Sequence, residues 1–161
     1  MHGRLLANLK TLAAHEVKFI VVGGVGAVIQ GCPVMTFDLD IVHERSQSNL
    51  RRLALALGEL DAIYRSQPER RLRPSLEALA GPGHHLLLTV HGPMDVLGEI
   101  GNGHGYGQLI KVSEPIEIGD GLTSAVLSLD WLIRTKEEVG APKDLAVLEI
   151  LRETLRLKTA S

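Results

Sequence analysis

The chain has 161 residues, of which 45% are hydrophobic and 22% charged, so it suits one folded domain and is not a disordered tail. A formal net charge of −2 gives no sign of a dedicated nucleic-acid binder, although an acidic total is compatible with a local basic patch. The single cysteine, Cys32, excludes an internal disulfide framework. Without an apolar stretch of ~18 residues or a signal-peptide pattern, we expect a cytoplasmic protein with no membrane partner.

Hydrophobic periodicity predicts a mixed order of helices and strands. Helices are expected at 3–17, 24–32, 46–60, 128–140 and 143–158, and strands at 18–24, at 36–44, on both sides of Gly92-Pro93 within 84–100, and in a hairpin at 115–128. Residues 65–75 are expected to form a polar connection, and the glycines of 101–107 predict a mobile loop. The predicted fold class is α/β (α+β), a small mixed sheet flanked by helices with a C-terminal helical pair.

One predicted strand carries two acidic residues. In residues 36–44, Phe37, Leu39 and Ile41 alternate with Asp38 and Asp40, so both aspartates lie on the same face. Burying a carboxylate costs several kcal/mol unless a partner or a cation meets it. The pattern therefore favours a cation held between the two side chains.

A glycine pair precedes this strand and suits a phosphate. Gly23-Gly24 follows a β-branched run and opens a short helix, where backbone N–H groups can approach an anion closely. Mg²⁺ usually binds one or two carboxylates together with substrate phosphates. The two features together predict a nucleoside triphosphate placed over a metal ion.

These residues resemble the signature of the DNA polymerase β-like nucleotidyltransferase superfamily, a Gly-Gly or Gly-Ser turn followed by an Asp-x-Asp pair on the next strand. In this chain Gly23-Gly24 precedes Asp38-Leu39-Asp40. The resemblance implies a third carboxylate on a later strand, for which Asp95 is the candidate.

The C-terminal helices extend the resemblance. They are similar to those of small bacterial members, including the nucleotidyltransferases of abortive-infection type IV toxin–antitoxin systems. The resemblance implies that Lys136, Lys143 and Asp144 lie near the triphosphate. It also implies one nucleotidyltransferase-like domain over 1–161, with a catalytic core at 1–125 and helices at 126–161.

The activity that the resemblance implies is transfer of a nucleoside monophosphate from an NTP to an acceptor hydroxyl, with release of pyrophosphate. The implied cofactor is Mg²⁺ or Mn²⁺. Asp38 and Asp40 would hold the ion on the triphosphate, and Asp95 with one of them would hold a second ion that activates the hydroxyl. One departure from the pattern is Gly24, which stands where many members have serine.

Other functions leave part of the pattern unexplained. A Rossmann fingerprint would need glycine or alanine where Ile29 stands. A haloacid-dehalogenase-type phosphatase with Asp38 as nucleophile would give the glycine pair no role. The clustered histidines lack the His-x-x-x-His spacing of a zinc site. The alternative to an enzyme is a non-catalytic partner-binding module of the same fold, such as an antitoxin or a regulatory subunit.

The acceptor (RNA, a protein or a small molecule) is expected to be chosen by the loops Arg65–Arg73 and Gly101–Gly107. The arginines of the first loop would steer a polyanion such as RNA. Because the chain is short, we expect a partner protein or a homodimer to complete the cleft.

Overall fold

The structure is a computed structural model that describes residues 3–36 and 38–160. The helices are α1 (Gly3–Ala14), α2 (Gly23–Ile29), α3 (Gln47–Glu59), α4 (Leu76–Ala80), α5 (Tyr106–Leu109), α6 (Leu129–Val139) and α7 (Leu145–Thr159). The strands are β1 (Phe19–Val22), β2 (Leu39–His43), β3 (Ile63–Tyr64), β4 (His84–Thr89), β5 (Gly92–Leu97), β6 (Glu99–Ile100), β7 (His104–Gly105), β8 (Ser113–Gly119) and β9 (Leu122–Leu127). Every helix and strand expected from the sequence is present, and β3, α4, β6, β7 and α5 are additional.

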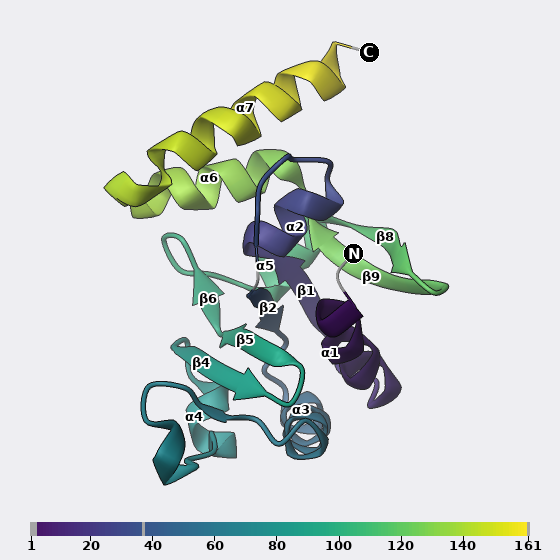
Figure 1. Ribbon diagram of the computed structural model, residues 1–161, viewed down its shortest axis with the longest axis vertical. Coiled ribbons are helices and arrows are strands. Elements are labelled where there is room, and N and C mark those ends of the chain that lie inside the picture. Colours follow the sequence, from purple (N-terminus) through teal and green to yellow (C-terminus); the bar gives the residue numbers. More distant parts are fainter. Residues whose placement is uncertain (1–2, 37, 161) are drawn as a thin grey trace.

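Within the described residues, seven strands form one mixed sheet in the order β3-β4-β5-β2-β1-β9-β8 (Figure 1). β1 runs antiparallel to β2 and parallel to β9, and β2 runs parallel to β5. A Rossmann unit joins parallel strands through its crossover helix, whereas β1 and α2 lead into an antiparallel neighbour. The topology therefore excludes a dinucleotide-binding fold and confirms the predicted mixed sheet.

The two faces of the sheet pack against different helices. Leu39 and Ile41 belong to one hydrophobic cluster with the leucines of α1 and α3, while Val22 and Val42 belong to a second cluster with α5, α6 and α7. Alternation then places Asp40 on the same face as Val42, the face covered by α6. The strand prediction is thus confirmed for 39–42, while Phe37 lies outside the described residues.

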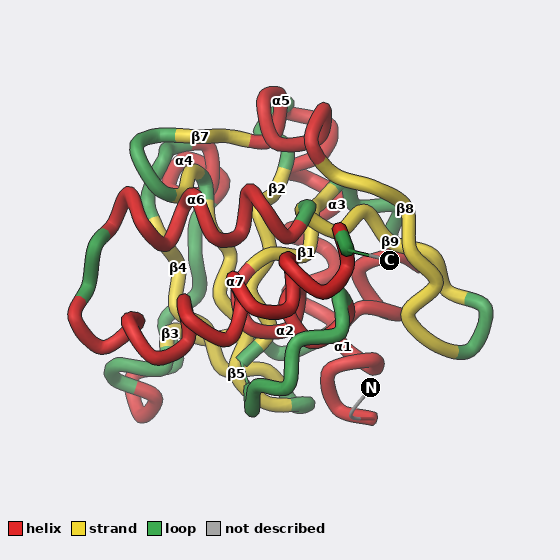
Figure 2. The backbone as a smooth tube through the Cα atoms, turned by 90° about the horizontal axis from the view of Figure 1, so that it is seen from above, coloured by secondary structure: helices red, strands yellow, loops and turns green. Residues whose placement is uncertain are grey.

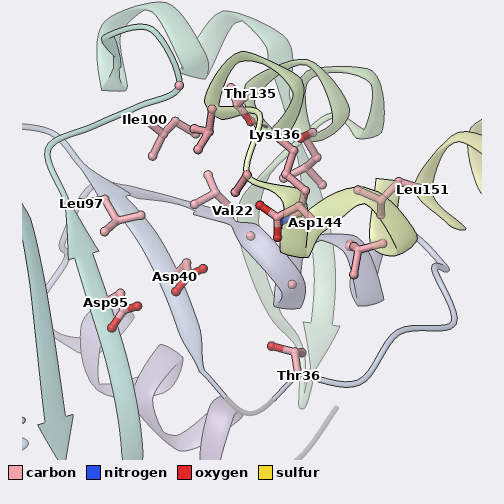
Figure 3. Close-up of a pocket in the computed structure, with 18 of the residues that line it drawn as sticks. Val22, Thr36, Asp40, Asp95, Leu97, Ile100, Thr135, Lys136, Asp144 and Leu151 are labelled. Atoms are coloured by element: carbon pink, nitrogen blue, oxygen red, sulfur yellow. Dashed lines mark hydrogen bonds and ion pairs between the residues drawn. The ribbon is translucent and has the colours of Figure 1, made fainter. Parts of the chain in front are cut away.

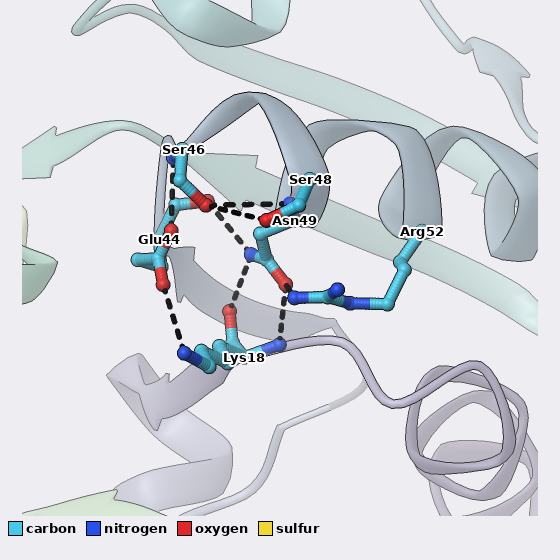
Figure 4. A network of polar contacts seen from close by, with 6 residues as sticks. All are labelled: Lys18, Glu44, Ser46, Ser48, Asn49 and Arg52. Atoms are coloured by element: carbon cyan, nitrogen blue, oxygen red, sulfur yellow. Dashed lines mark hydrogen bonds and ion pairs between the residues drawn. The ribbon is translucent and has the colours of Figure 1, made fainter.

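A buried amide fixes the end of the β1–β2 pair that lies away from Asp40 (Figure 4). Asn49 accepts a hydrogen bond from the backbone N–H of Lys18 at 2.8 Å, and its Nδ2 donates to the carbonyls of Lys18 at 3.0 Å and Glu44 at 2.7 Å. Ser46 caps α3 by accepting from the Asn49 N–H at 3.3 Å. The start of β1, the end of β2 and the start of α3 are therefore held by one side chain.

The break within residues 84–100 was predicted at Gly92-Pro93, and this position is wrong. Gly92 and Pro93 are the first two residues of β5, and the turn is formed by the two residues before them. The Thr89 hydroxyl closes this turn, because it donates to the Gly92 carbonyl at 3.0 Å and accepts from the His91 N–H at 3.0 Å. Proline is tolerated here because it lies at the beginning of a strand.

The expectation that 101–107 is an irregular loop is wrong for 104–107. Residues 101–103 form the turn of the β6–β7 hairpin, 104–105 are β7 and 106–107 begin α5, and His104 is buried against α6. His104 Nε2 donates to Glu138 at 2.8 Å, and the ring meets Trp131 edge-on with centroids 5.3 Å apart. These contacts come from residues far along the chain, so the local glycine content does not reveal them.

The C-terminal helices form the expected pair and lie side by side (Figures 1 and 2). Gly140 ends α6 with a φ of 66°, and Pro142 begins the short turn into α7. An ion pair of 3.1 Å joins Arg152 of α7 to Glu137 of α6. Among the described helices, none is both long and apolar enough to cross a membrane.

Candidate active site

Two carboxylates lie side by side on neighbouring strands. Asp40 of β2 is the register partner of Asp95 of β5, and on its other side it is the partner of Val22, the last residue of β1 (Figure 3). The Asp95 side chain is 14% exposed. The parallel β2–β5 pairing thus brings together two acidic residues that α3, β3, α4 and β4 separate in the sequence.

The protein environment disfavours a negative charge on Asp40. Burial, and after it the charge of Asp95, raise the pKa of Asp40 from an ordinary 3.8 to about 7, while Lys136 acts in the opposite direction. Its Oδ1 is buried and has no hydrogen-bond partner within the described residues. A cation at this position would offset the repulsion between Asp40 and Asp95 and would give Oδ1 a partner.

The glycine pair lies directly against Asp40. Gly23 has a φ of +63°, and a Cβ there would overlap the Oδ2 atom of Asp40. A Cβ on Gly24 would come within 2.7 Å of Thr36 Oγ1, so the Thr36 hydroxyl lies next to the place of the serine that is missing at position 24. Glycine is therefore required at position 23 both for the backbone conformation and for the close approach of the carboxylate.

The predicted C-terminal residues face the same space. Lys136 of α6 and Asp144, just before α7, form an ion pair of 3.6 Å, and Lys143 is exposed beside them. Together with Gly23, Gly24, Asp40 and Asp95 they line one cavity of about 600 Å³ (Figure 3). Seven of the eight site residues predicted from the sequence therefore surround one cavity large enough for a nucleotide.

The eighth, Asp38, lies just before β2 and is 48% exposed. The lining of the cavity, as far as the chain is described, includes Asp40 and Asp95 but not Asp38. The Asp38 carboxylate instead lies 3.9 Å from the guanidinium of Arg65. Asp38 thus approaches the carboxylate pair from the side of β3 and β4.

Arg65, which the sequence assigned to the acceptor loop, belongs to the carboxylate site, and this contact was not predicted. Its Nη1 donates to Asp95 Oδ1 at 2.5 Å and its Nη2 to Asp95 Oδ2 at 3.4 Å. Hydrogen bonding to Asp95 raises the pKa of Arg65, so the guanidinium is charged throughout the accessible range. Arg65 comes directly after the apolar pair Ile63-Tyr64, whereas none of the later arginines of the segment follows such a pair. This position is the sequence signal that could have distinguished Arg65 from the solvated arginines.

A divalent cation fits this donor set. The Oδ1 of Asp40 has no partner among the described residues, whereas both oxygens of Asp95 accept from Arg65. One or two carboxylates are the usual protein contribution to a Mg²⁺ site completed by phosphates, and Asp40 offers the first of them. Within the described part of the chain, no three His, Cys, Asp or Glu side chains gather into a ready-made metal cluster. This geometry suits an ion that arrives with its substrate, and it offers no cluster for zinc.

Comparison with known proteins identifies the fold. The chain is similar to a crystal structure from Thermotoga maritima described as a "putative nucleotidyltransferase", with a TM-score of 0.62 and 19% sequence identity over 97% of this chain and 95% of the other. No protein-family model matches the chain, and no curated protein matches its sequence. The likeness extends over almost all of both chains, and the fold is the nucleotidyltransferase fold.

Proposed function

We propose that the chain is a metal-dependent nucleotidyltransferase, which moves a nucleoside monophosphate from an NTP to an acceptor hydroxyl and releases pyrophosphate. The observation that carries this proposal is the cavity in which the paired carboxylates Asp40 and Asp95 face Lys136 and Lys143. Carboxylates on one wall and lysines on the other suit a triphosphate with its metal ion. The fold shared with the Thermotoga maritima protein supports the same activity.

Each residue has a distinct part in this proposal. Asp38 and Asp40 would hold Mg²⁺ or Mn²⁺, which when bound neutralises the triphosphate and polarises the phosphorus under attack. Lys136 and Lys143 bind the phosphates, and their charges also stabilise the departing pyrophosphate. Gly23 leaves the backbone accessible to the phosphates. Asp144 orients the Lys136 ammonium through their ion pair.

The test is calorimetric binding of ATP, GTP, CTP and UTP with and without Mg²⁺. The wild type is compared with the double variant Asp38→Asn/Asp40→Asn, and Asp130→Asn is the control because this exposed carboxylate of α6 lies outside the cavity lining. We expect Mg²⁺-dependent binding of at least one NTP in the wild type and the control, and its loss in the double variant. Equal binding in all three proteins would place the nucleotide elsewhere.

The non-catalytic alternative predicts a different result. A partner-binding module of this fold would keep its partner and its cellular effect in the Asp38→Asn variant, whereas an enzyme would lose nucleotidyl transfer. The buried, unpartnered oxygen of Asp40 favours the enzyme, because a scaffold gains nothing from a destabilising carboxylate.

The acceptor is proposed by class alone. RNA, a protein side chain and a small molecule all offer the hydroxyl that the reaction needs, and incubation with a labelled NTP and a cell extract distinguishes them.

The toxin–antitoxin role, the cytoplasmic location and a homodimer that completes the cleft stay predictions from the sequence. Arg71 and Arg73 of the first acceptor loop both pair with Asp61, so fewer of its charges are free to meet a polyanion than the sequence indicates.

A further inference from the structure

The Arg65 guanidinium is held at a fixed position beside the carboxylates. Besides its two contacts to Asp95, its Nη1 donates to the Leu87 carbonyl at 3.2 Å, and Asp38 lies 3.9 Å away. The backbone N–H of Arg65 donates to the Leu86 carbonyl at 3.1 Å, which anchors the other end of the residue to β4. Its side chain is 28% exposed. These restraints distinguish Arg65 from a solvated surface arginine.

The other arginines of the segment point to different partners. Arg71 and Arg73 pair with Asp61, and Arg70 donates to Gln67 at 2.9 Å. Arg65 alone among these four contacts a residue that lines the nucleotide cavity. Its position is therefore a specific feature of the site and not a general property of a basic segment.

A guanidinium and a divalent cation can both neutralise the charge of neighbouring carboxylates. Asp95 is largely buried, and a buried carboxylate next to a second carboxylate requires a positive charge. Arg65 supplies it through a two-pronged contact, in the space between Asp95 and Asp38 where an ion bound by both would lie. The Oδ1 atom of Asp40, by contrast, has no hydrogen-bond partner among the described residues, which leaves this carboxylate available to one ion.

We propose that Arg65 takes the place of one of the two divalent cations, so that the site binds a single divalent ion at Asp40 together with the triphosphate. This inference rests on the proposed function, because it concerns the metal content of the same nucleotide site. In this arrangement Asp95 is the positioning residue, because it holds the Arg65 guanidinium in place. Arg65 supplies a permanent positive charge beside the reacting groups.

The test counts Mn²⁺ ions by equilibrium dialysis and by electron paramagnetic resonance, with α,β-methylene-ATP or α,β-methylene-GTP as the bound nucleotide. We expect one Mn²⁺ per bound nucleotide in the wild type. Arg65→Gln is expected to bind two, and to show the spin exchange of ions about 3.5–4 Å apart. Arg65→Lys keeps the charge and is expected to stay at one, as is the control Arg70→Ala.

A second variant keeps the test decisive if Arg65→Gln does not fold. Asp95→Asn is expected to retain its one Mn²⁺, whereas a site with two ions would lose one. Two ions in the wild type, or one ion in a folded Arg65→Gln protein, would overturn the inference and leave the proposed function intact. Failure of ATP, GTP, CTP and UTP alike to bind the wild type with Mn²⁺ would instead refute the proposed function, and this inference with it.

Discussion

Replacing Asp40 by asparagine is expected to stabilise the metal-free protein while abolishing its proposed activity. Burial and Asp95 raise the pKa of Asp40 to about 7, so at pH 8 the folded chain carries a charge that its surroundings disfavour. The interval from an ordinary 3.8 to about 7 corresponds to about 4 kcal/mol, at about 1.4 kcal/mol per pH unit. Water in the open cavity screens part of this charge, and we expect a gain of about 2 kcal/mol in the free energy of unfolding.

The gain has a defined pH dependence. Below pH 4 the Asp40 carboxyl is protonated in the folded and the unfolded chain, so asparagine brings no electrostatic advantage. As the pH rises from about 4 to 7, the unfolded chain releases this proton before the folded chain does, and the wild type loses stability. Above about pH 7 both states are ionised, and the difference between wild type and variant reaches a plateau.

Urea unfolding followed by circular dichroism in the presence of EDTA, at pH 4, 6 and 8, measures this difference. The matched control is Asp38→Asn, two residues away and 48% exposed, for which we expect a change under about 0.5 kcal/mol at every pH. Added Mg²⁺ is expected to stabilise the wild type and not the Asp40→Asn protein. A variant that is less stable at pH 8, or a difference that does not vary between pH 4 and 8, would refute the argument.

Two further predictions concern the glycine turn and the hairpin. Gly23→Ala is expected to lower the free energy of unfolding in urea by about 3 kcal/mol, and Gly31→Ala by about 1 kcal/mol. Both glycines have a positive φ, but only a Cβ at position 23 would meet a carboxylate. Equal losses in the two variants would contradict this. His104→Ala is expected to accelerate hydrogen exchange of residues 99–107 at least tenfold and to cost about 2 kcal/mol, because it removes a partly buried hydrogen bond to Glu138. Unchanged exchange would mean that the hairpin is ordered without that contact.

The fold followed from the sequence wherever the periodicity was strong. Alternation in 39–42 and the amphipathic helices α3, α6 and α7 were read correctly because their burial patterns are local. The two-residue strand β3 and the five-residue helix α4 were missed because such short elements carry no measurable period. The β6–β7 hairpin was missed because its order depends on α6, which follows later in the chain.

The candidate site was predictable in its composition more than in its geometry. A shared face was predicted for Asp38 and Asp40 from their spacing, but Asp38 lies before β2 and only Asp40 lines the cavity. Asp95 was identified through family resemblance alone. Its position beside Asp40 depends on the β2–β5 register. Arg65 reaches Asp95 because β3 and β4 extend the sheet beyond β5, and nothing in the local sequence specifies that strand order.

The strand that leads into the glycine turn obtains its second neighbour from the far end of the chain. Ile20 and Val21 of β1 pair with Ala125 and Val126 of β9, roughly a hundred residues later. Pairing over such a separation slows folding, because a long loop must close before the contact contributes. During synthesis β1 therefore has an open, hydrophobic edge until β9 leaves the ribosome. A fragment that ends before β9 would contain Asp40 and Asp95 and yet present a strand ready to pair with other chains.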